Sequence, residues 1–544
     1  MLKKASIALV FGALTTLAFA PFDLPYLALI TPSVLFLLLK KQSIKQAIWL
    51  GWIFGLGFFG TGISWVYVSI HVYGNTHAVV AGLLTFTFCA ALALLFLVQI
   101  WVYQKYFSGR GCTIAFGAIW LLFEWARSWF LTGFPWLYLG YATLDTPFSP
   151  LASIGGVWLN SAIVITLGLA FANVIYTRQK SSLAIAVSIS LLTVTSAYFV
   201  PKNWTHTSGE LIDVAIIQPN IPQKTKWNSA YLAEILDKYY RMTEPLLGKR
   251  VIIWPETAIP SLYPVVESFL GPLAERQKAL GGSLISGIPM KVLDLDHPKG
   301  RRIHNSIFNL TELSSYHKQR LVPFGEYIPL QNEFRDLLNF LNIPDFTFSV
   351  PKLTPQPLLR VGAYKYSTAI CYEIAYPELV RQYSKKSDII LTLSNDTWFS
   401  HSIGPDQHFQ IARMRAIENG RWLIRSSNNG ISAIVSPQGE VIKQAPRYTE
   451  AVLQAKVQPL QGLTPYQKYG QWPLISSYFL ILAVLGWHNR SMQSKRARSN
   501  TLRQNEQGWH NRSMQSKRAR FNAMRQSAEN KPLLAFRRVD KASF

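Results

Sequence analysis

The sequence predicts a multi-pass α-helical membrane domain with eight spans, joined to an extracytoplasmic α/β domain. Composition is the first indication, because 49% of the 544 residues are apolar and only 15% are charged, with a mean hydropathy of +0.14. The distribution of apolar residues along the chain is the second indication, because long apolar runs fill the first 200 residues, whereas charges and prolines become frequent after Thr205. A membrane protein that carries a soluble domain has this pattern.

Eight apolar runs are long enough to cross about 30 Å of hydrocarbon. They lie near residues 5–20, 24–39, 47–69, 79–103, 113–134, 152–176, 183–200 and 470–487. We therefore predict a membrane domain over 1–204, a soluble domain over 205–465, an eighth span over 466–487 and a basic tail over 488–544.

The short loops predict the orientation, since Lys and Arg collect on the cytoplasmic side. They occupy alternate loops, beginning with Lys3 and Lys4, so both chain ends are expected in the cytoplasm and the soluble domain outside it. Ala18-Phe19-Ala20 also has the form of a signal-peptide cleavage site. We expect the first span to be retained, because the second follows almost at once.

The soluble domain alternates strand-like and helical segments. Strand-like runs lie at 213–218, 251–254, 283–288, 306–310, 364–370, 389–393, 422–426 and 431–435, and helical patterns at 230–247 and 408–418. This order predicts a sheet with helices on its faces, in which reactive groups lie where strands end.

Three strand ends carry residues suited to chemistry. Glu256 follows 251–255, Lys318 precedes Glu326 by eight positions, and Cys371 follows 364–370. Taken singly, they could be a surface carboxylate, a solvated lysine and a packed cysteine. Taken together, they fit acyl transfer through a thioester: the carboxylate removes the thiol proton, and the cation with backbone N–H groups holds the oxyanion. A nearby ammonium would also favour the thiolate.

These motifs resemble those of the apolipoprotein N-acyltransferases of the bacterial cytoplasmic membrane, whose outer domain belongs to the nitrilase (carbon–nitrogen hydrolase) superfamily. Phe123-Glu124-Trp125-Ala126-Arg127 and Thr132-Gly133-Phe134-Pro135-Trp136 extend the resemblance into the membrane part, and it reaches to about residue 487. The resemblance implies an αββα sandwich with Glu256 as general base, Lys318 as oxyanion-stabilising cation and Cys371 as nucleophile. It also implies supporting roles for Trp227, Glu326, Tyr372 and Glu373.

The resemblance further implies the substrates. The acyl donor would be a phospholipid, typically phosphatidylethanolamine, and the acceptor the α-amino group of an N-terminal diacylglyceryl cysteine on an apolipoprotein. The soluble domain would then be periplasmic. No cofactor, metal or nucleic-acid partner is expected, and His401 and His408 are interpreted as structural. Two alternatives remain open: a membrane-anchored amidase or nitrilase, and a transporter or sensor with an outer binding domain.

Three further features lead to predictions. Glu124 and Arg127 share one face of a span, so they either pair with each other or face a polar cavity. Apolar residues between 334 and 343 predict a lid or lipid entrance, or else an ordinary core helix. The segment 486–498 recurs almost unchanged at 508–520. From residue 490 onward, fourteen Lys or Arg against three acidic residues contribute +11 of the overall +25, which predicts a disordered tail attracted to anionic lipid.

Overall fold

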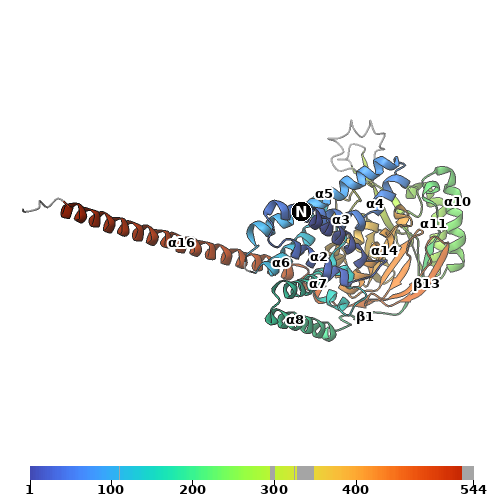
Figure 1. Cartoon of the computed structure of the whole chain (residues 1–544). Helices are drawn as coiled ribbons and strands as arrows, with labels where there is room; N and C mark the ends of the chain where they lie inside the picture. Colours follow the sequence, from blue (N-terminus) through green and yellow to red (C-terminus); the bar gives the residue numbers. More distant parts are fainter. Residues whose placement is uncertain (110, 295–299, 324, 328–347, 530–544) are drawn as a thin grey trace, which may run out of the picture. The chain divides into compact units, whose positions relative to one another are not determined.

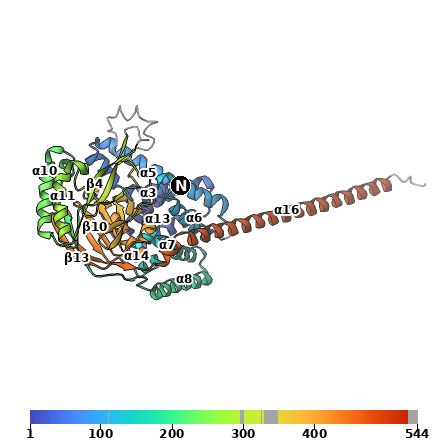
Figure 2. The same cartoon turned by 180° about the vertical axis from the view of Figure 1, so that it is seen from behind.

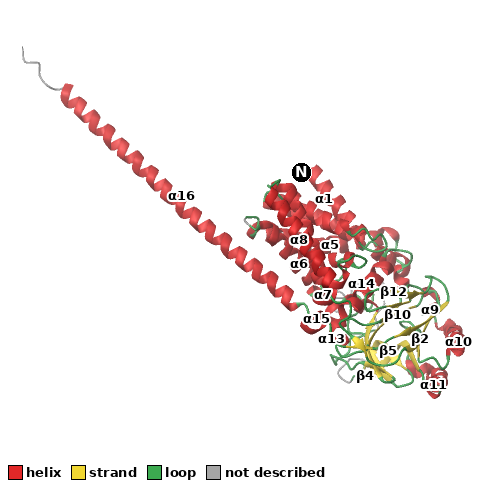
Figure 3. Ribbon diagram, turned by 90° about the horizontal axis from the view of Figure 1, so that it is seen from below, coloured by secondary structure: helices red, strands yellow, loops and turns green. Residues whose placement is uncertain are grey.

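The computed structural model describes residues 1–109, 111–294, 300–323, 325–327 and 348–529 (Figure 1). The chain forms two compact units, Met1–Leu482 and Ala483–Phe544. Within the first unit, the strands gather at one end and most of the apolar helices at the other (Figure 3). The apolar helices and the α/β domain therefore belong to one compact unit.

A helix lies at each of the first seven apolar runs. The helices of this part are α1 (Leu2–Leu14), α2 (Tyr26–Leu38), α3 (Ile44–Gly62), α4 (Trp65–Val68), α5 (Ala78–Tyr106), α6 (Cys112–Ala126), α7 (Ala152–Thr177) and α8 (Lys180–Phe199). Among the described residues, three helices are long and apolar enough to cross a membrane, or up to four if the bent pair Ile44–Gly62 and Trp65–Tyr73 is one span. The predicted count of eight spans is therefore not confirmed. Helices α1, α2 and α6 have 13, 13 and 15 residues, and at about 1.5 Å per residue these are short of the bilayer thickness.

Close helix packing holds this part together. Gly57 of α3 lies against α1, where an added Cβ would come within 2.2 Å of the Leu9 carbonyl oxygen. Small residues at such contacts let two helix backbones approach, which is how apolar helices associate without a hydrophobic driving force between them. Substitution at Gly57 would separate α1 from α3.

In the described part of the chain, the α/β domain contains two six-stranded sheets, with strand orders β12-β11-β10-β9-β8-β7 and β13-β2-β3-β4-β5-β6. The strands of the first are β7 (Leu359–Val361), β8 (Tyr364–Ile370), β9 (Ile389–Ser394), β10 (Leu423–Ser427), β11 (Ala433–Val435) and β12 (Val441–Gln444). Those of the second are β2 (Ile212–Gln218), β3 (Val251–Ile253), β4 (Ser283–Leu293), β5 (Arg301–Asn309), β6 (Ser314–His317) and β13 (Ala451–Val457). A short pair, β1 (His206–Thr207) and β14 (Leu460–Gln461), lies beside them.

The sheets pack face to face with helices outside, as an αββα sandwich. In β2, Val214 and Ile216 contact the facing sheet, whereas Ala215 and Ile217 pack under the helices. Helices α10 (Leu232–Thr243) and α11 (Tyr263–Ala279) cover this sheet (Figure 2), and α13 (Pro377–Ser384) and α14 (Gly404–Asn419) cover the other. Burial on both faces explains why these strands read as continuous apolar runs.

Several elements were not predicted from the sequence. These are β1, β6, β7, β12, β13, β14, α11 and α13, together with the one-turn helices α9 (Gln223–Lys226) and α15 (Pro465–Tyr469). Strands β6, β7, β12 and β13 lie at sheet edges, and β12 is exposed along its length. Edge strands need little apolar character, so pairing rather than pattern defines them.

The C-terminal segment differs from the predicted disordered tail, because Trp472–Glu529 forms one helix, α16. It contains eight Arg, five Gln and five Ala, and it has no proline between Pro473 and Pro532. These residues have high helix propensity, so the sequence of both repeat copies favours helix over an irregular chain.

Candidate active site

Cys371 lies at the end of β8, where the chain turns sharply. It is the first residue of the short 3-10 turn Cys371–Ala375, which we call the nucleophile turn, and its φ is +51°. Left-handed backbone costs a non-glycine residue about 1–3 kcal/mol, so surrounding contacts must hold it. Cys371 is only 9% exposed. Its thiol is thus fixed in direction and nearly removed from water.

The carboxylate of Glu373 ties the nucleophile turn to the segment that follows β6. Its Oε2 accepts a hydrogen bond from the Ile370 N–H at 2.8 Å, and its Oε1 accepts from the N–H groups of Gln319 and Arg320 at 2.6 and 3.1 Å. Burial raises the pKa of Glu373 to about 7, although the N–H groups oppose this shift. Glu373 therefore links, by hydrogen bonds, two segments that are about fifty positions apart in the chain.

Lys318 lies between two carboxylates. Its Nζ is 2.8 Å from Oε1 of Glu326 and 3.4 Å from Oε1 of Glu256. The side-chain amide of Asn305 donates to the same two oxygens, at 3.2 Å and 2.8 Å respectively. Lys318 and Glu256 are buried. We call Glu256, Lys318 and Glu326 the charge cluster, and it brings together three residues that the sequence predicted for the site.

Burial and the charge cluster together shift the pKa of Cys371. Burial opposes the charge on Lys318, but the carboxylates of Glu326 and Glu256 outweigh it and raise the pKa of Lys318. Burial and the nearby Glu256 also raise the pKa of the Cys371 thiol, which Lys318 offsets only in part. The prediction that Lys318 would favour the thiolate thus describes the smaller contribution. A thiol with a raised pKa needs a base to take its proton before the sulfur can act as a nucleophile.

A loop of the membrane part, residues 132–138, lies against the nucleophile turn. The carbonyl oxygen of Gly133 accepts hydrogen bonds from the hydroxyls of Tyr372 and Tyr376 at 3.1 and 3.2 Å. The ring of Trp136 stacks on that of Tyr372, with centroids 6.4 Å apart and planes at 20°. Gly133 has a φ of +92°, and a Cβ there would lie 2.4 Å from the Ser128 carbonyl oxygen, so this turn requires glycine. The loop therefore positions Tyr372, a predicted supporting residue.

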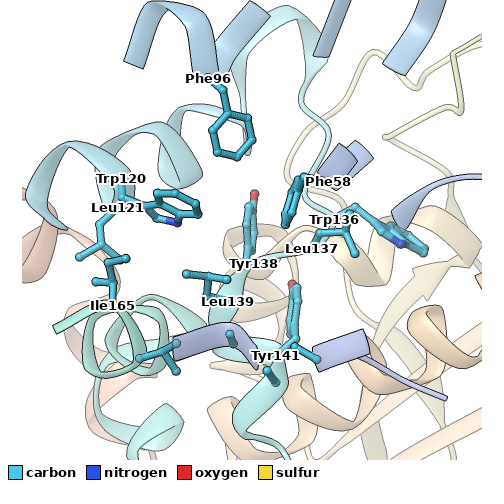
Figure 4. Close-up of a cluster of buried hydrophobic side chains, with 14 of the residues drawn as sticks. Phe58, Phe96, Trp120, Leu121, Trp136, Leu137, Tyr138, Leu139, Tyr141 and Ile165 are labelled. Carbon is cyan, nitrogen blue, oxygen red and sulfur yellow. The ribbon is translucent and has the colours of Figure 1, made fainter. Parts of the chain in front are cut away.

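Glu124 and Arg127 hold this loop rather than each other. Oε1 of Glu124 accepts from the Trp120 indole N–H at 3.1 Å and from the Leu139 N–H at 3.0 Å. The Arg127 guanidinium donates to the Trp136 carbonyl oxygen at 3.0 Å. Figure 4 shows the loop side chains, including Tyr138, among aromatic rings from the surrounding helices. Both charged residues thus satisfy irregular backbone inside the apolar part.

Trp227 is not part of this arrangement, although the sequence predicted it for the site. It follows α9 and is 49% exposed. Its neighbour Lys226 is buried, and Nζ of Lys226 donates to the Glu256 carbonyl oxygen at 3.1 Å. Burial lowers the pKa of Lys226 to about 8, and Glu256 opposes the shift. The residue before Trp227 therefore contacts the backbone of Glu256, a member of the charge cluster.

Asn305, Lys226 and His408 are site residues that the sequence did not reveal. Asn305 lies in the middle of β5, so it could not be identified from the end of a strand. His408 was interpreted as structural, but its Nε2 is 3.1 Å from the carbonyl oxygen of Cys371. The pairing of sheets and helices creates these contacts, and no local sequence signal indicates them.

The structure also bears on metal binding and on the cysteines, but not on the predicted lid. Among the described residues, no group of three or more His, Cys, Asp or Glu side chains could hold a metal ion. Cys89, Cys112 and Cys371 are all free. The predicted lid at 334–343 lies outside the described residues.

Comparison with known proteins gives matches over both parts of the chain. The profile described as "Apolipoprotein N-acyltransferase N-terminal domain" matches residues 11–170, and the profile described as "Carbon-nitrogen hydrolase" matches residues 213–466. An apolipoprotein N-acyltransferase of Pseudomonas aeruginosa is 39% identical over 498 residues, which are 90% of this chain and 97% of that protein.

A second relative, the apolipoprotein N-acyltransferase of Pseudomonas syringae, is 41% identical over 492 residues, covering 88% of this chain and 95% of its own. Among solved structures, a nitrilase-superfamily protein of Saccharomyces cerevisiae covers 47% of this chain and 93% of its own length, at 21% identity and a TM-score of 0.33.

Proposed function

The chain belongs to the apolipoprotein N-acyltransferase family, and from this premise we propose how its residues carry out the reaction. The enzyme transfers an acyl chain from a phospholipid to the α-amino group of the N-terminal S-diacylglyceryl cysteine of an apolipoprotein. Cys371 is the nucleophile, Glu256 the general base and Lys318 the cation that stabilises the oxyanion. Two half-reactions share one thiol, so the kinetics are ping-pong.

In the first half-reaction, Glu256 accepts the thiol proton while the Cys371 sulfur attacks the ester carbonyl of the donor. The tetrahedral oxyanion forms beside the Lys318 ammonium, whose charge is maintained by Glu326 and Glu256. The C–O bond then breaks, and Glu256 returns the proton to the departing alcohol of the lysophospholipid. The product is a thioester on Cys371.

In the second half-reaction, the α-amino group of the acceptor attacks the thioester carbonyl. Glu256 takes a proton from the amine, the C–S bond breaks and the thiol is regenerated. A thioester is near in energy to an ester and well above an amide, so the sequence of steps runs downhill without a nucleotide. The burial of Cys371 supports this proposal, because excluding water favours transfer over hydrolysis.

The observation that carries the proposal is the position of Lys318. A buried ammonium paired with two carboxylates beside a buried thiol is an expensive arrangement that helix or sheet packing does not need. Its components are the base, the cation and the nucleophile that acyl transfer requires.

The donor is proposed from the same chemistry, and the orientation from the Lys and Arg of the short loops. Phosphatidylethanolamine is the proposed donor, because the periplasm has no nucleotide supply and the acyl group must arrive as an ester. The proposed topology has eight spans, both chain ends in the cytoplasm and the sandwich on the periplasmic side. Trp227 is proposed to contact substrate from its exposed position.

The test distinguishes acyl transfer from hydrolysis by a membrane-anchored amidase or nitrilase. Purified full-length protein in nanodiscs receives acyl-labelled phosphatidylethanolamine, followed by a diacylated lipopeptide with a free N-terminal cysteine amine. The proposal predicts label in the peptide amide, with none when Cys371 is replaced by alanine. Release of the label as free fatty acid, with the peptide unmodified, would establish hydrolysis instead.

A further inference from the structure

His408 lies behind the nucleophile, in a fully buried polar network. Its Nε2 is 3.1 Å from the Cys371 carbonyl oxygen, and its Nδ1 is 3.0 Å from both the Arg425 guanidinium and Oδ1 of Asp396. Arg425 in turn donates to Oδ2 of Asp396 at 2.8 Å. Asp396, Arg425 and His408 come from three separate elements of the sandwich. The imidazole is therefore held rigidly from the side opposite Cys371.

The contacts of the ring require a proton on Nε2. Burial and the adjacent Arg425 lower the pKa of His408, whereas Asp396 and the Cys371 carbonyl oxygen oppose the shift. Nε2 faces a carbonyl oxygen, which only accepts, so a hydrogen bond between them requires a proton on Nε2. Nδ1 lies between an N–H of Arg425 and the Asp396 carboxylate. His408 thus donates to the Cys371 carbonyl oxygen.

This hydrogen bond fixes a whole peptide plane. The peptide bond between Cys371 and Tyr372 is planar and trans, so the Tyr372 N–H points opposite to the Cys371 carbonyl, away from His408. As the second residue of the 3-10 turn, Tyr372 has no partner for its N–H within that turn. The same bond opposes relaxation of the left-handed Cys371 backbone, whose φ is +51°.

We propose that His408 is a positioning residue for the acyl-transfer reaction. It holds the Cys371 carbonyl so that the sulfur stays directed toward the charge cluster, and so that the Tyr372 N–H is available as a second oxyanion donor beside Lys318. Asp396 and Arg425 keep the imidazole in the orientation that this requires. The inference rests on the proposed role of Cys371 as nucleophile.

A matched pair of substitutions tests it. The amide nitrogen of glutamine in His408→Gln reaches the former position of Nε2, whereas the shorter asparagine in His408→Asn replaces Nδ1 and loses contact with Cys371. Single-turnover formation of the acyl-enzyme is measured in nanodiscs over a range of donor concentrations. For His408→Asn we expect the maximal acylation rate to fall about 100-fold, since misdirecting an oxyanion donor costs this much. The donor concentration for half-maximal rate should not change, and His408→Gln should recover most of the rate.

Controls separate this role from a structural one and from the proposed function. His401 is exposed, so His401→Asn is the matched control. Acyl-enzyme on wild-type Cys371 verifies the nucleophile independently of His408. Thermal unfolding of each variant is recorded, and if His408→Asn does not fold, Asp396→Asn replaces it with the same expected slowing. A folded His408→Asn or Asp396→Asn protein that acylates at the wild-type rate would overturn the inference, and so would equal losses in His408→Asn and His408→Gln.

Discussion

Buried acidic and basic side chains are used differently in the membrane part and in the charge cluster. In the membrane part, Glu124 and Arg127 bond mainly to the backbone of the loop 132–138 and of Leu139. In the charge cluster, Lys318 contacts the carboxylates of Glu256 and Glu326 directly. The first arrangement satisfies peptide groups where no water is available. The second places two carboxylates and an ammonium near the Cys371 thiol, and these are the groups that the proposed acyl transfer requires.

This difference shows what a buried charge contributes in each place. A carboxylate that only accepts hydrogen bonds can be replaced by another acceptor of the same shape. A carboxylate that must take a proton during the reaction cannot be replaced in this way. The exchange of Glu for Gln should therefore have a large effect on activity in the charge cluster and a small one in the membrane part.

The largest expected effect is that of Glu256→Gln. Glutamine keeps the volume and the oxygen that accepts from Asn305, but it cannot remove the Cys371 proton. Acyl transfer should fall by about 10²–10⁴-fold, the contribution of a general base. Glu124→Gln is the matched control, and its activity should stay within about tenfold of wild type, because the amide oxygen still accepts from Trp120 and Leu139. The measurement is the amount of labelled lipopeptide formed. Equal losses in Glu256→Gln and Glu124→Gln would contradict the proposed difference between the two carboxylates.

Lys318→Met tests whether the ammonium of the charge cluster serves the reaction as well as the fold. Methionine has a similar length but no charge, so the oxyanion loses its cation and two buried carboxylates lose their partner. We expect about 10²–10³-fold slower acylation and a loss of about 3–5 kcal/mol in the free energy of unfolding.

Kinetics and thermal unfolding of the purified Lys318→Met protein measure both quantities. A variant that loses stability but acylates at the wild-type rate would show that Lys318 has only a structural role.

Tyr372→Phe tests the contact between the two regions. The change removes the hydrogen bond to the Gly133 carbonyl oxygen and keeps the ring that stacks on Trp136. We expect a loss of about 0.5–1.5 kcal/mol in unfolding free energy and a decrease in acylation rate of about tenfold or less. Tyr376→Phe, which removes a similar bond to the same oxygen, is the matched control. If only Tyr372→Phe slows acylation, the loop acts on the nucleophile turn rather than on general packing.

The smallest effect concerns pH. Burial and then the nearby His304 lower the pKa of His317 to about 4. The folded state therefore binds fewer protons than the unfolded state below about pH 6.5, so His317 stabilises the fold above that pH and its contribution is lost as pH falls toward 4. Thermal unfolding between pH 7 and 4 should show a smaller decrease in His317→Gln than in wild type. Identical pH profiles would contradict this.

The sequence predicted those parts of the site that depend on short segments. Strands buried on both faces read as apolar runs, and Glu256, Lys318 and Cys371 follow such runs or short extended segments, so the residues of the proposed site could be located from strand ends. Asn305 and His408 reach the site only through strand pairing and helix packing, which no local pattern encodes.

The membrane part was less predictable. Hydropathy located the helices, but it did not reveal that α1, α2 and α6 are short or that the loop 132–138 enters the site. Glu124 and Arg127 were recognised as unusual in an apolar run, yet their partners are main-chain atoms that a sequence pattern cannot identify. The edge strands were missed for the related reason that hydrogen bonding to a neighbour, rather than apolar content, defines them.

The most direct test of the account is to locate the acyl group after the first half-reaction alone. Full-length protein is incubated with a labelled phospholipid donor in the absence of acceptor, digested and mapped by mass spectrometry, with hydroxylamine treatment to identify a thioester. The account predicts one hydroxylamine-sensitive acyl group on the peptide that contains Cys371, with a strongly reduced yield in Glu256→Gln. An acyl group on any other residue, or transfer to the lipopeptide that persists in Cys371→Ala, would contradict it.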